Sequence, residues 1–270
     1  MEYMINVDLE GVHGVVGEPW SGLARTIPEY KKAVEAAVYE INAAAGALFD
    51  AGADKVSVWD NHGGDVNIDF ADLDPRIEEI RCKDDPKRYD FVKNHSYDGA
   101  FLMGYHAKDG TLNGVLAHSF SSVGIQYIKV NGVSVGEMEI DSWILASHGI
   151  PTKLFSSDEQ GILQAKAIGS GTETVITKYG TGRNSAILRE REDVLRDIRE
   201  SAAKAVTLPG VMPVFPAPAE VEVRYTRMEA AAEVFSTITA EGCIPVQYGE
   251  DAHILRFTVK NANDIPRFMR

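Results

Sequence analysis

Two carboxylates lie two residues apart near the start of the chain, in the sequence VDLEGVHG that begins at Val7. Side chains two residues apart on a strand project from the same face, so Asp8 and Glu10 are expected to lie side by side. Two carboxylates held that close repel each other, and burying them is costly unless a cation is present. This spacing therefore predicts a metal-binding pair at the end of the first strand.

Three histidines and a third carboxylate follow or interrupt other apolar segments. His62 lies in DNHGG just after KVSVW, His106 directly follows GAFLMGY, His118 lies in VLAHSF, and Glu137 lies in VSVGEM. Imidazole nitrogens and carboxylate oxygens are the ligands that zinc and manganese accept in hydrolases. Each residue alone would also fit a structural role, such as a turn, a core histidine or a charged edge strand. Together they exceed what one ion needs and favour a two-metal site.

A β-α-β unit would bring the first of these residues together. Residues 3–9 predict a buried strand, a helix follows a capping box of Thr26 and Glu29, and residues 55–59 predict a second strand. Such a unit implies parallel strands, whose carboxyl ends meet at one edge of the sheet, where ligand sites gather. Polar neighbours expected to orient the ligands are Asp60, Asn61 and Ser119.

The remaining segments predict one more parallel strand and a block of antiparallel strands. Residues 99–105 resemble the first two strands, and from Gly114 three apolar runs with an Asn131-Gly132 turn predict antiparallel pairing. Later elements are expected to be a strand at 152–155, a helix at 158–168, a strand at 175–178 and a long helix over most of 184–208. We therefore expect an α/β protein with a mostly parallel sheet flanked by helices and an antiparallel β portion.

A proline-rich segment marks the expected domain boundary. Residues 209–218 (PGVMPVFPAP) contain four prolines, which is typical of a linker. Residues 1–208 are expected to form the metal-binding catalytic domain. Residues 219–270 are expected to form a smaller α+β segment, which either stands apart or packs on the main sheet.

The composition excludes some classes of partner. The formal net charge of −13 argues against a nucleic acid or an anionic membrane as the main partner. Cys82 and Cys243 form no disulfide framework, which favours a reducing, cytoplasmic setting. The first ten residues do not resemble a signal peptide, and no apolar run is long enough for a membrane span.

Five motifs follow one another in order along the chain: VDLEG, DNHG, GYHA, AHS and VGE. This order resembles the zinc D-aminopeptidase family that is encoded with dipeptide-transport genes. The resemblance covers Tyr3 to about Leu145 and continues more loosely through TKYGTGRNSA at residues 177–186. It implies a two-zinc aminopeptidase site, a two-domain α/β subunit and a ring-stacked homodecamer whose sites face an inner chamber.

The same resemblance implies a role for each candidate residue. Asp8 would bridge the two zinc ions, Glu10 and His62 would complete one ion, His106 and Glu137 would complete the other, and His118 would be the catalytic histidine beside them.

Two stretches depart from the family pattern. After Gly136-Glu137 the family has a small residue and then an asparagine, whereas this chain has Glu139 and Asp141. Further on, this chain has Ser157-Asp158 and Gln164 where Gly-Asp and a glutamate are usual. The added negative charge makes Glu139 and Asp141 candidates for binding the free ammonium group of a substrate.

The resulting hypothesis is metal-assisted hydrolysis of short peptides or amino-acyl amides, with a preference for D-residues that rests on the resemblance alone. Three alternatives stay open: a binuclear amidase acting on a non-peptide substrate, a metallophosphoesterase, and a metal-binding protein without turnover. A metallophosphoesterase site usually begins with D-x-H and ends with G-H-x-H, whereas this chain has D-x-E and no H-x-H.

Overall fold

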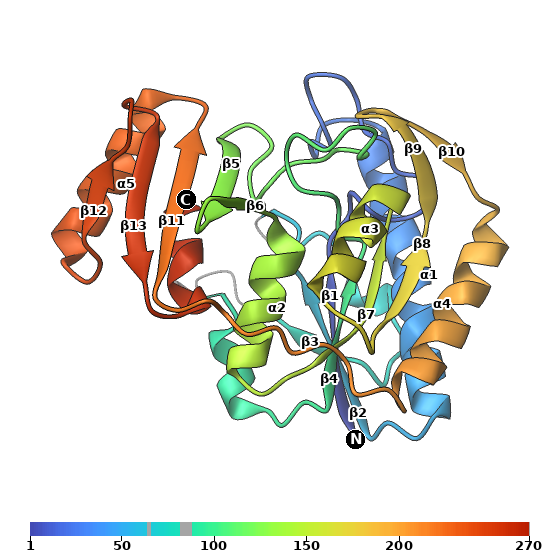
Figure 1. The fold of residues 1–270 in the computed structure, drawn as a ribbon. Coiled ribbons are helices and arrows are strands. Elements are labelled where there is room, and N and C mark those ends of the chain that lie inside the picture. The colour runs from blue at the N-terminus through green and yellow to red at the C-terminus, as the bar shows by residue number, and fades with distance from the viewer. Residues whose placement is uncertain (64–65, 82–87, 270) are drawn as a thin grey trace.

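The structure is a computed structural model that describes residues 1–63, 66–81 and 88–269. Its larger part is built on a six-stranded sheet in the order β3-β2-β1-β4-β7-β8, in which neighbouring strands pair in parallel (Figure 1). The strands are β1 (Glu2–Val7), β2 (Lys55–Asp60), β3 (Glu78–Ile80), β4 (Gly99–Met103), β7 (Thr152–Ser157) and β8 (Glu173–Ile176). The predicted parallel sheet is confirmed, and β1 lies between the strands that precede His62 and His106.

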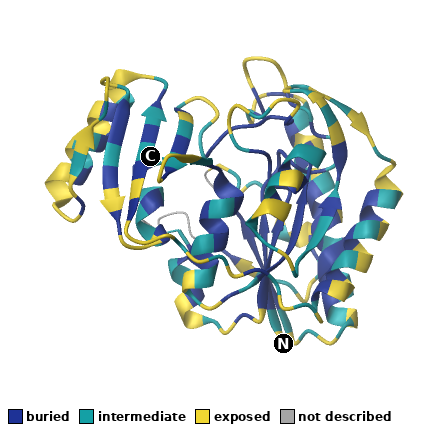
Figure 2. Cartoon of the chain, viewed as in Figure 1, coloured by how far each residue is buried: buried dark blue, intermediate teal, exposed yellow. Residues whose placement is uncertain are grey.

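Helices cover both faces of this sheet (Figure 1). The helices are α1 (Glu29–Asp50) and α4 (Arg191–Ala205) on one face, and α2 (Glu137–Ser147) and α3 (Glu159–Ile168) on the other. Side chains of β1 alternate between the two cores, so Ile5 packs on the α1 face and Met4 on the α2 face. Both faces are therefore buried, which explains why these strands are almost continuous apolar runs (Figure 2).

A second, antiparallel sheet lies beside the first and has the order β12-β13-β11-β5-β6 (Figure 1). Its strands are β5 (Ile125–Val130), β6 (Val133–Val135), β11 (Ala219–Tyr225), β12 (Val246–Tyr248) and β13 (Ile254–Val259). The other elements are the hairpin of β9 (Lys178–Gly182) and β10 (Ser185–Leu188), helix α5 (Met228–Glu241), and the short helices η1 (Phe70–Asp72), η2 (Asp90–Asn94) and η3 (Ala262–Phe268).

The second sheet combines strands from both sides of the proline-rich segment. β11 pairs with β13 on one side and with β5 on the other, with Val223 opposite Ile128. The antiparallel portion and the C-terminal α+β segment, which the sequence suggested as separate features, thus share one sheet. The division into domains at residues 1–208 and 219–270 stays a prediction.

Two predicted strands that carry site residues have a different structure. Residues 115–120 form a turn, irregular loop and a bend, and Leu116 and Phe120 have φ angles of 52° and 59°, which an extended strand excludes. Glu137 is the first residue of α2, because Gly136 ends the extended segment and its N–H donates to Glu139, which caps the helix. The predictions of strands at His118 and at Glu137 were therefore wrong.

Two helix boundaries also differ from the prediction. α1 begins at Glu29 after Pro28, and no side chain caps it. The Glu29 carboxylate instead accepts a hydrogen bond from the Val16 N–H, so the capping box with Thr26 was wrong. Residues 185–188 form β10, so α4 is shorter than the helix predicted over 184–208.

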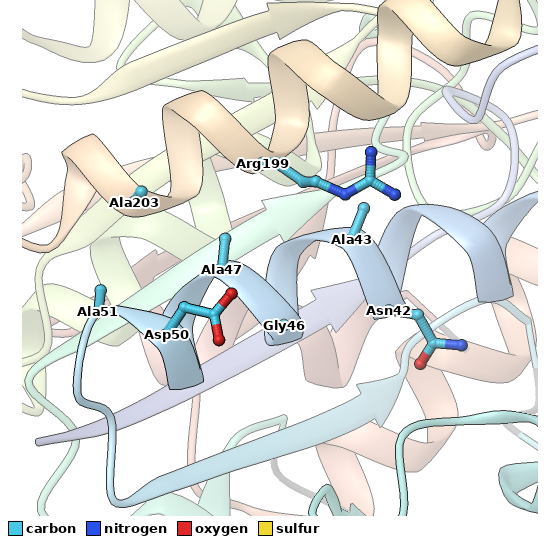
Figure 3. Close-up of a pocket in the computed structure, with 8 residues that line it drawn as sticks. All are labelled: Asn42, Ala43, Gly46, Ala47, Asp50, Ala51, Arg199 and Ala203. Atoms are coloured by element: carbon cyan, nitrogen blue, oxygen red, sulfur yellow. The ribbon is translucent and has the colours of Figure 1, made fainter.

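Small side chains of α1 face α4 on the outer surface of the larger part. A surface cavity of about 360 Å³ lies there between Ala43, Gly46 and Ala47 of α1 and Arg199 of α4 (Figure 3). Because α1 runs antiparallel to β1, these residues near its C-terminus lie toward the amino ends of the strands. The cavity is therefore distant from the carboxyl edge at which the candidate ligands gather.

None of the helices in the described part of the chain combines the length and the apolar character that crossing a bilayer requires. Cys243 is exposed and is not in a disulfide. Cys82 lies outside the described residues.

A buried carboxylate on α1 supports the loop that follows β1. Glu40 is 2% exposed, and its Oε1 accepts a hydrogen bond of 2.7 Å from the His13 N–H. Burial raises the pKa of Glu40 to about 7. The folded state therefore binds more protons than the unfolded state between the ordinary pKa of a glutamate and pH 7. Protonation of Glu40 thus favours the folded state at low pH, and this contribution to the free energy of unfolding is lost as the pH rises through 7.

We predict that Glu40→Gln, which cannot ionise, removes this loss of stability. The free energy of unfolding of the variant, relative to the parent protein, should increase by about 2 to 3 kcal/mol between pH 5 and pH 8. Urea denaturation of metal-free protein across this range would measure the difference. Glu35→Gln, on an exposed position of the same helix, is the matched control. Parallel pH profiles of Glu40→Gln and the parent protein would contradict the prediction.

Candidate metal centre

The structure brings the six predicted residues together at the carboxyl edge of the parallel sheet. Asp8 and Glu10 follow β1, His62 follows β2, His106 follows β4, His118 lies in the loop before β5, and Glu137 begins α2. Five of these side chains are buried, and His62 is the most accessible, with 14% of its side chain exposed. Adjacent parallel strands thus deliver four of the residues to one edge, as the strand pattern predicted, and a loop and α2 add His118 and Glu137.

The first group contains Asp8, Glu10 and His62. The Nδ1 atom of His62 lies 2.9 Å from Oδ1 of Asp8 and 2.9 Å from Oε2 of Glu10. One ligand atom from each residue lies within 4.8 Å of the others, which is close enough to surround a single metal ion.

The second group contains His106, His118 and Glu137, and Asp8 joins it to the first. The Nε2 atom of His106 lies 3.1 Å from Oε1 of Glu137 and 3.4 Å from Oδ2 of Asp8. The Nε2 atom of His118 lies 3.8 Å from Oε1 of Glu137, and the rings of the two histidines stack with centroids 3.8 Å apart. The two oxygens of Asp8 therefore face two different groups of potential ligands.

Backbone carbonyls determine which ring nitrogens face the cluster. Nδ1 of His106 lies 3.0 Å from the carbonyl of Ala107, and Nδ1 of His118 lies 2.8 Å from that of Leu116. A nitrogen in such a contact must donate, so each neutral ring directs the lone pair of Nε2 toward the carboxylates.

One buried nitrogen shows that the residues fit a metal. Nε2 of His106 is one of the buried polar atoms in the described residues that form no hydrogen bond of acceptable geometry. A buried polar atom without a partner is costly and needs an explanation. This atom lies between the carboxylates of Asp8 and Glu137, which is where a metal ion would complete its contacts. The mixed nitrogen and oxygen donors suit zinc.

Burial and like charges shift the pKa values of the cluster. Burial and the charge of Glu10 raise the pKa of Asp8 to about 7. Burial acts in the same direction on Glu137, but the charge of the nearby His106 outweighs it and lowers the pKa of Glu137 to about 2. Burial and the charge of His106 lower the pKa of His118 to about 4, which keeps this imidazole neutral near pH 7. The cluster therefore combines mutually repelling acids with one neutral imidazole.

A buried lysine fixes the loop that carries Glu10. Lys178 is fully buried, and its ammonium group donates to the carbonyls of Glu10 at 2.5 Å and Val12 at 2.8 Å. Burial lowers the pKa of Lys178 to about 8. The side chain reaches the loop from β9, so the segment 177–186 supports the site from behind it.

The loops after β1 and β4 pack backbone against backbone. The Gly11 N–H donates to the carbonyl of Gly104 at 2.7 Å, and the Asp8 N–H donates to that of Met103 at 2.9 Å. Gly104 has a φ of 68°, and a Cβ atom there would lie 2.1 Å from the carbonyl oxygen of Asp8. A side chain at position 104 would therefore displace the backbone of a candidate ligand.

The two acids predicted to bind substrate both have partners within the protein. Glu139 accepts a hydrogen bond from the Gly136 N–H at 3.0 Å, and its other oxygen lies 3.4 Å from the ammonium of Lys108. Asp141 is fully buried, forms a bidentate ion pair with Arg88 and accepts a hydrogen bond from Tyr105. Their role toward a substrate stays a prediction.

The residues at the second departure also have structural roles. Asp158 caps α3 by accepting from the Gly161 N–H at 2.7 Å, and its other oxygen accepts from the Val115 N–H at 2.6 Å. Gln164 accepts from the Lys108 N–H at 3.0 Å. These contacts hold the two ends of the segment between His106 and His118.

The sequence analysis missed Lys178, Arg88 and Tyr105. Lys178 interrupts the apolar run VITKYG, and a lysine in such a run is a signal of a buried, paired charge. Tyr105 adjoins His106, but its aromatic ring alone indicates only a core position. Arg88 ends the charged run KDDPKR, which is typical of a solvated loop and gave no signal.

Two adjoining groups of carboxylates and histidines at the carboxyl edge of a parallel sheet are typical of binuclear metallohydrolases with an α/β fold. A model of the D-aminopeptidase family, peptidase family M55, matches residues 1–270. The chain belongs to this family, which confirms the resemblance seen in the motifs.

Individual proteins agree with this assignment. A D-aminopeptidase of Bacillus subtilis (strain 168) is 24% identical over 187 residues, which span 68% of this chain and 66% of the relative. The solved structure of the Zn-dependent D-aminopeptidase DppA from Bacillus subtilis, described as a self-compartmentalizing protease, superposes with a TM-score of 0.85 at 19% identity. That match covers 100% of this chain and 95% of the other, and it shows that the fold is shared.

We predict that Gly104→Ala destabilises the protein far more than the same change at Gly110. Both glycines have positive φ angles, but a Cβ at Gly110 would have no neighbour within 4 Å. The difference between the two variants therefore isolates the contacts with the Asp8 backbone and the Val12 side chain, which should cost about 1 to 3 kcal/mol beyond the backbone strain. Thermal and urea denaturation would measure it. Equal destabilisation by the two variants would show that the loops do not constrain each other.

Proposed function

We propose that this protein is a zinc-dependent aminopeptidase that hydrolyses short peptides with an N-terminal D-residue, through two zinc ions in each subunit. Membership of the D-aminopeptidase family supports peptide hydrolysis. The observation that carries the two-metal part is the position of Asp8, whose two oxygens face His62 and His106 separately. The preference for D-residues and the use of zinc are extended from the Bacillus subtilis proteins.

The proposed ligands follow the two groups. Asp8 would be shared by the two ions, Glu10 and His62 would complete the ligands of one, and His106 and Glu137 would complete those of the other. Zinc bound there supplies Lewis acidity toward the scissile carbonyl and toward the water that attacks it. The protein's own contribution is to hold the three carboxylates together, to keep both histidines in one tautomer, and to limit the access of bulk water to the buried half of the site.

His118 is the proposed proton carrier. Its Nδ1 atom is held by the carbonyl of Leu116, so Nε2 faces the cluster. Its low pKa leaves this nitrogen free to accept a proton from the attacking water near pH 7 and to pass it to the leaving amine. His118 also lies close enough to His106 and Glu137 to be a third ligand of the second group. An experiment on a His118 variant therefore has to distinguish the role of proton carrier from that of metal ligand.

We also propose a homodecamer with a cytoplasmic location and sites that open into an inner chamber, which would restrict substrates to short peptides. The family resemblance and the self-compartmentalizing character of the Bacillus subtilis structure support an assembly. Trp20, Leu112, Val123 and Val214 are each at least 75% exposed, and subunit contacts would cover such side chains. The sequence has only two cysteines, which form no disulfide framework, and this favours a reducing compartment.

We predict that zinc-loaded protein hydrolyses D-amino-acyl amides and D,L-dipeptides faster than their L-counterparts. Activity should disappear with a chelator and return with zinc, because the proposed reaction requires the Lewis acid. Matched D- and L-substrates measured under the same conditions test chirality and metal dependence together. Hydrolysis of the L-substrates but not of the D-substrates would contradict the proposed preference for D-residues. No turnover with two zinc ions bound would favour an amidase for a non-peptide substrate.

We predict that His118→Ala lowers kcat by roughly 10² to 10⁴-fold, the usual effect of removing a general acid–base group. The variant should still bind two zinc ions, since Asp8, Glu10, His62, His106 and Glu137 remain. Elemental analysis after dialysis measures the metal content, and His253→Ala, in the turn before β13, is the control. Loss of one zinc ion from His118→Ala would assign this histidine as a ligand instead.

A further inference from the structure

Three polar residues beside the proposed ligands form a buried chain of hydrogen bonds. Asn61 precedes His62, Tyr105 precedes His106, and Asp141 lies one helical turn after Glu137. Nδ2 of Asn61 donates to the Tyr105 hydroxyl at 2.8 Å, and this hydroxyl donates to Oδ2 of Asp141 at 2.6 Å. The chain links the ends of β2 and β4 to Asp141 on α2.

Arg88 completes this network from a segment that is distant in sequence. Its Nε and Nη2 atoms donate to Asp141 at 2.6 and 2.8 Å, which is a bidentate pair. Its side chain is only 14% exposed, and the guanidinium lies over the rings of Phe120 and Trp59 at 4.9 and 5.5 Å. The stacking and the ion pair together fix the guanidinium in one orientation.

The same guanidinium approaches a proposed metal ligand. Nη2 of Arg88 lies 3.8 Å from Oε2 of Glu137. The other oxygen of Glu137 accepts a hydrogen bond from the Phe120 N–H at 2.8 Å and faces His106. Glu137 thus has one oxygen directed toward the proposed metal and one directed toward a cation of the protein itself.

Asp141 determines whether the Glu137 carboxylate is oriented toward the proposed metal ion or toward Arg88. An unpaired guanidinium at this distance would attract the Glu137 carboxylate and would repel a divalent ion in the adjoining group. Asp141 neutralises the guanidinium and occupies two of its donors, so the Glu137 carboxylate stays oriented toward His106. The pair has no net charge, whereas Arg88 alone would add a positive charge beside the site.

We propose that Asp141 is a positioning residue that, by pairing with Arg88, keeps Glu137 available to the second metal ion. The inference rests on the proposed two-metal function and gives Asp141 a task different from binding a substrate's ammonium group. A purely structural ion pair would affect the stability of the fold without selectively changing the affinity for one of two metal ions.

The test compares zinc affinities of the parent protein, Asp141→Asn and the double variant Arg88→Met/Asp141→Asn, by titration against a chromophoric chelator. Asp141→Asn leaves the guanidinium unpaired, so one of the two zinc ions should bind about 10 to 100-fold more weakly. The double variant has no unpaired charge and should bind both ions within about threefold of the parent protein. Asp74→Asn is the matched control, because Asp74 forms a similar pair with Arg76 on an exposed surface.

Each outcome decides the proposal. Unchanged zinc binding by Asp141→Asn would overturn it, and so would a double variant that binds zinc as weakly as Asp141→Asn does. If Asp141→Asn does not fold, the double variant and Tyr105→Phe remain decisive. Tyr105→Phe keeps the Arg88–Asp141 pair, so a tenfold or greater loss of zinc affinity there would overturn the proposal. A parent protein that binds fewer than two zinc ions would instead refute the proposed function.

Discussion

The mutual repulsion of buried carboxylates is the constraint on which the rest of the site depends. Asp8, Glu10 and Glu137 meet at one edge of the sheet, largely out of contact with water. His62 and His106 lie between these acids and compensate part of their charge. A cation of higher charge bound in the same place would compensate the repulsion more fully. The proposed zinc ions are such cations.

The fold holds these acids together against their repulsion by fixing backbone as well as side chains. Parallel pairing of β1 with β2 and β4 sets the spacing of three proposed ligands. Lys178 then binds the carbonyls next to Glu10, and the close approach of Gly11 to Gly104 locks the loops after β1 and β4 together. The proposed ligands lie on a constrained backbone. Metal binding would therefore cost little further conformational entropy.

Much of the fold and of the candidate site could be predicted from the sequence, because local patterns determine them. Apolar runs of strand length and a helix with a 3.6-residue period define a parallel β-α-β unit, which brings Asp8 and His62 together, and a third strand of the same kind brings His106 to the same edge. The strands expected at His118 and Glu137 were wrong because their boundaries depend on positive φ angles and on a helix cap, which apolar patterning does not show.

The partners of the ligands could not be predicted for a different reason. Arg88 and Asp141 are 53 residues apart, and only the packing of α2 on the sheet brings them into contact. A charged run such as KDDPKR has the same composition whether it is solvated or, as at Arg88, partly buried. Such contacts form only in the folded protein, so the residue pattern of a single sequence does not predict them.

The pairing of β5 with β11 has a consequence for biosynthesis. β5 and β6 lie immediately before Glu137 in the chain, yet their neighbour in the sheet, β11, begins at Ala219. During translation, one edge of β5 therefore stays open until at least 84 residues after the end of β6, from Val135 to Ala219, have left the ribosome tunnel. An open strand edge readily pairs with other chains, so crowded polysomes expose this protein to mispairing between nascent neighbours. Slow completion of the second sheet would make chaperone binding to the 125–135 hairpin advantageous during synthesis.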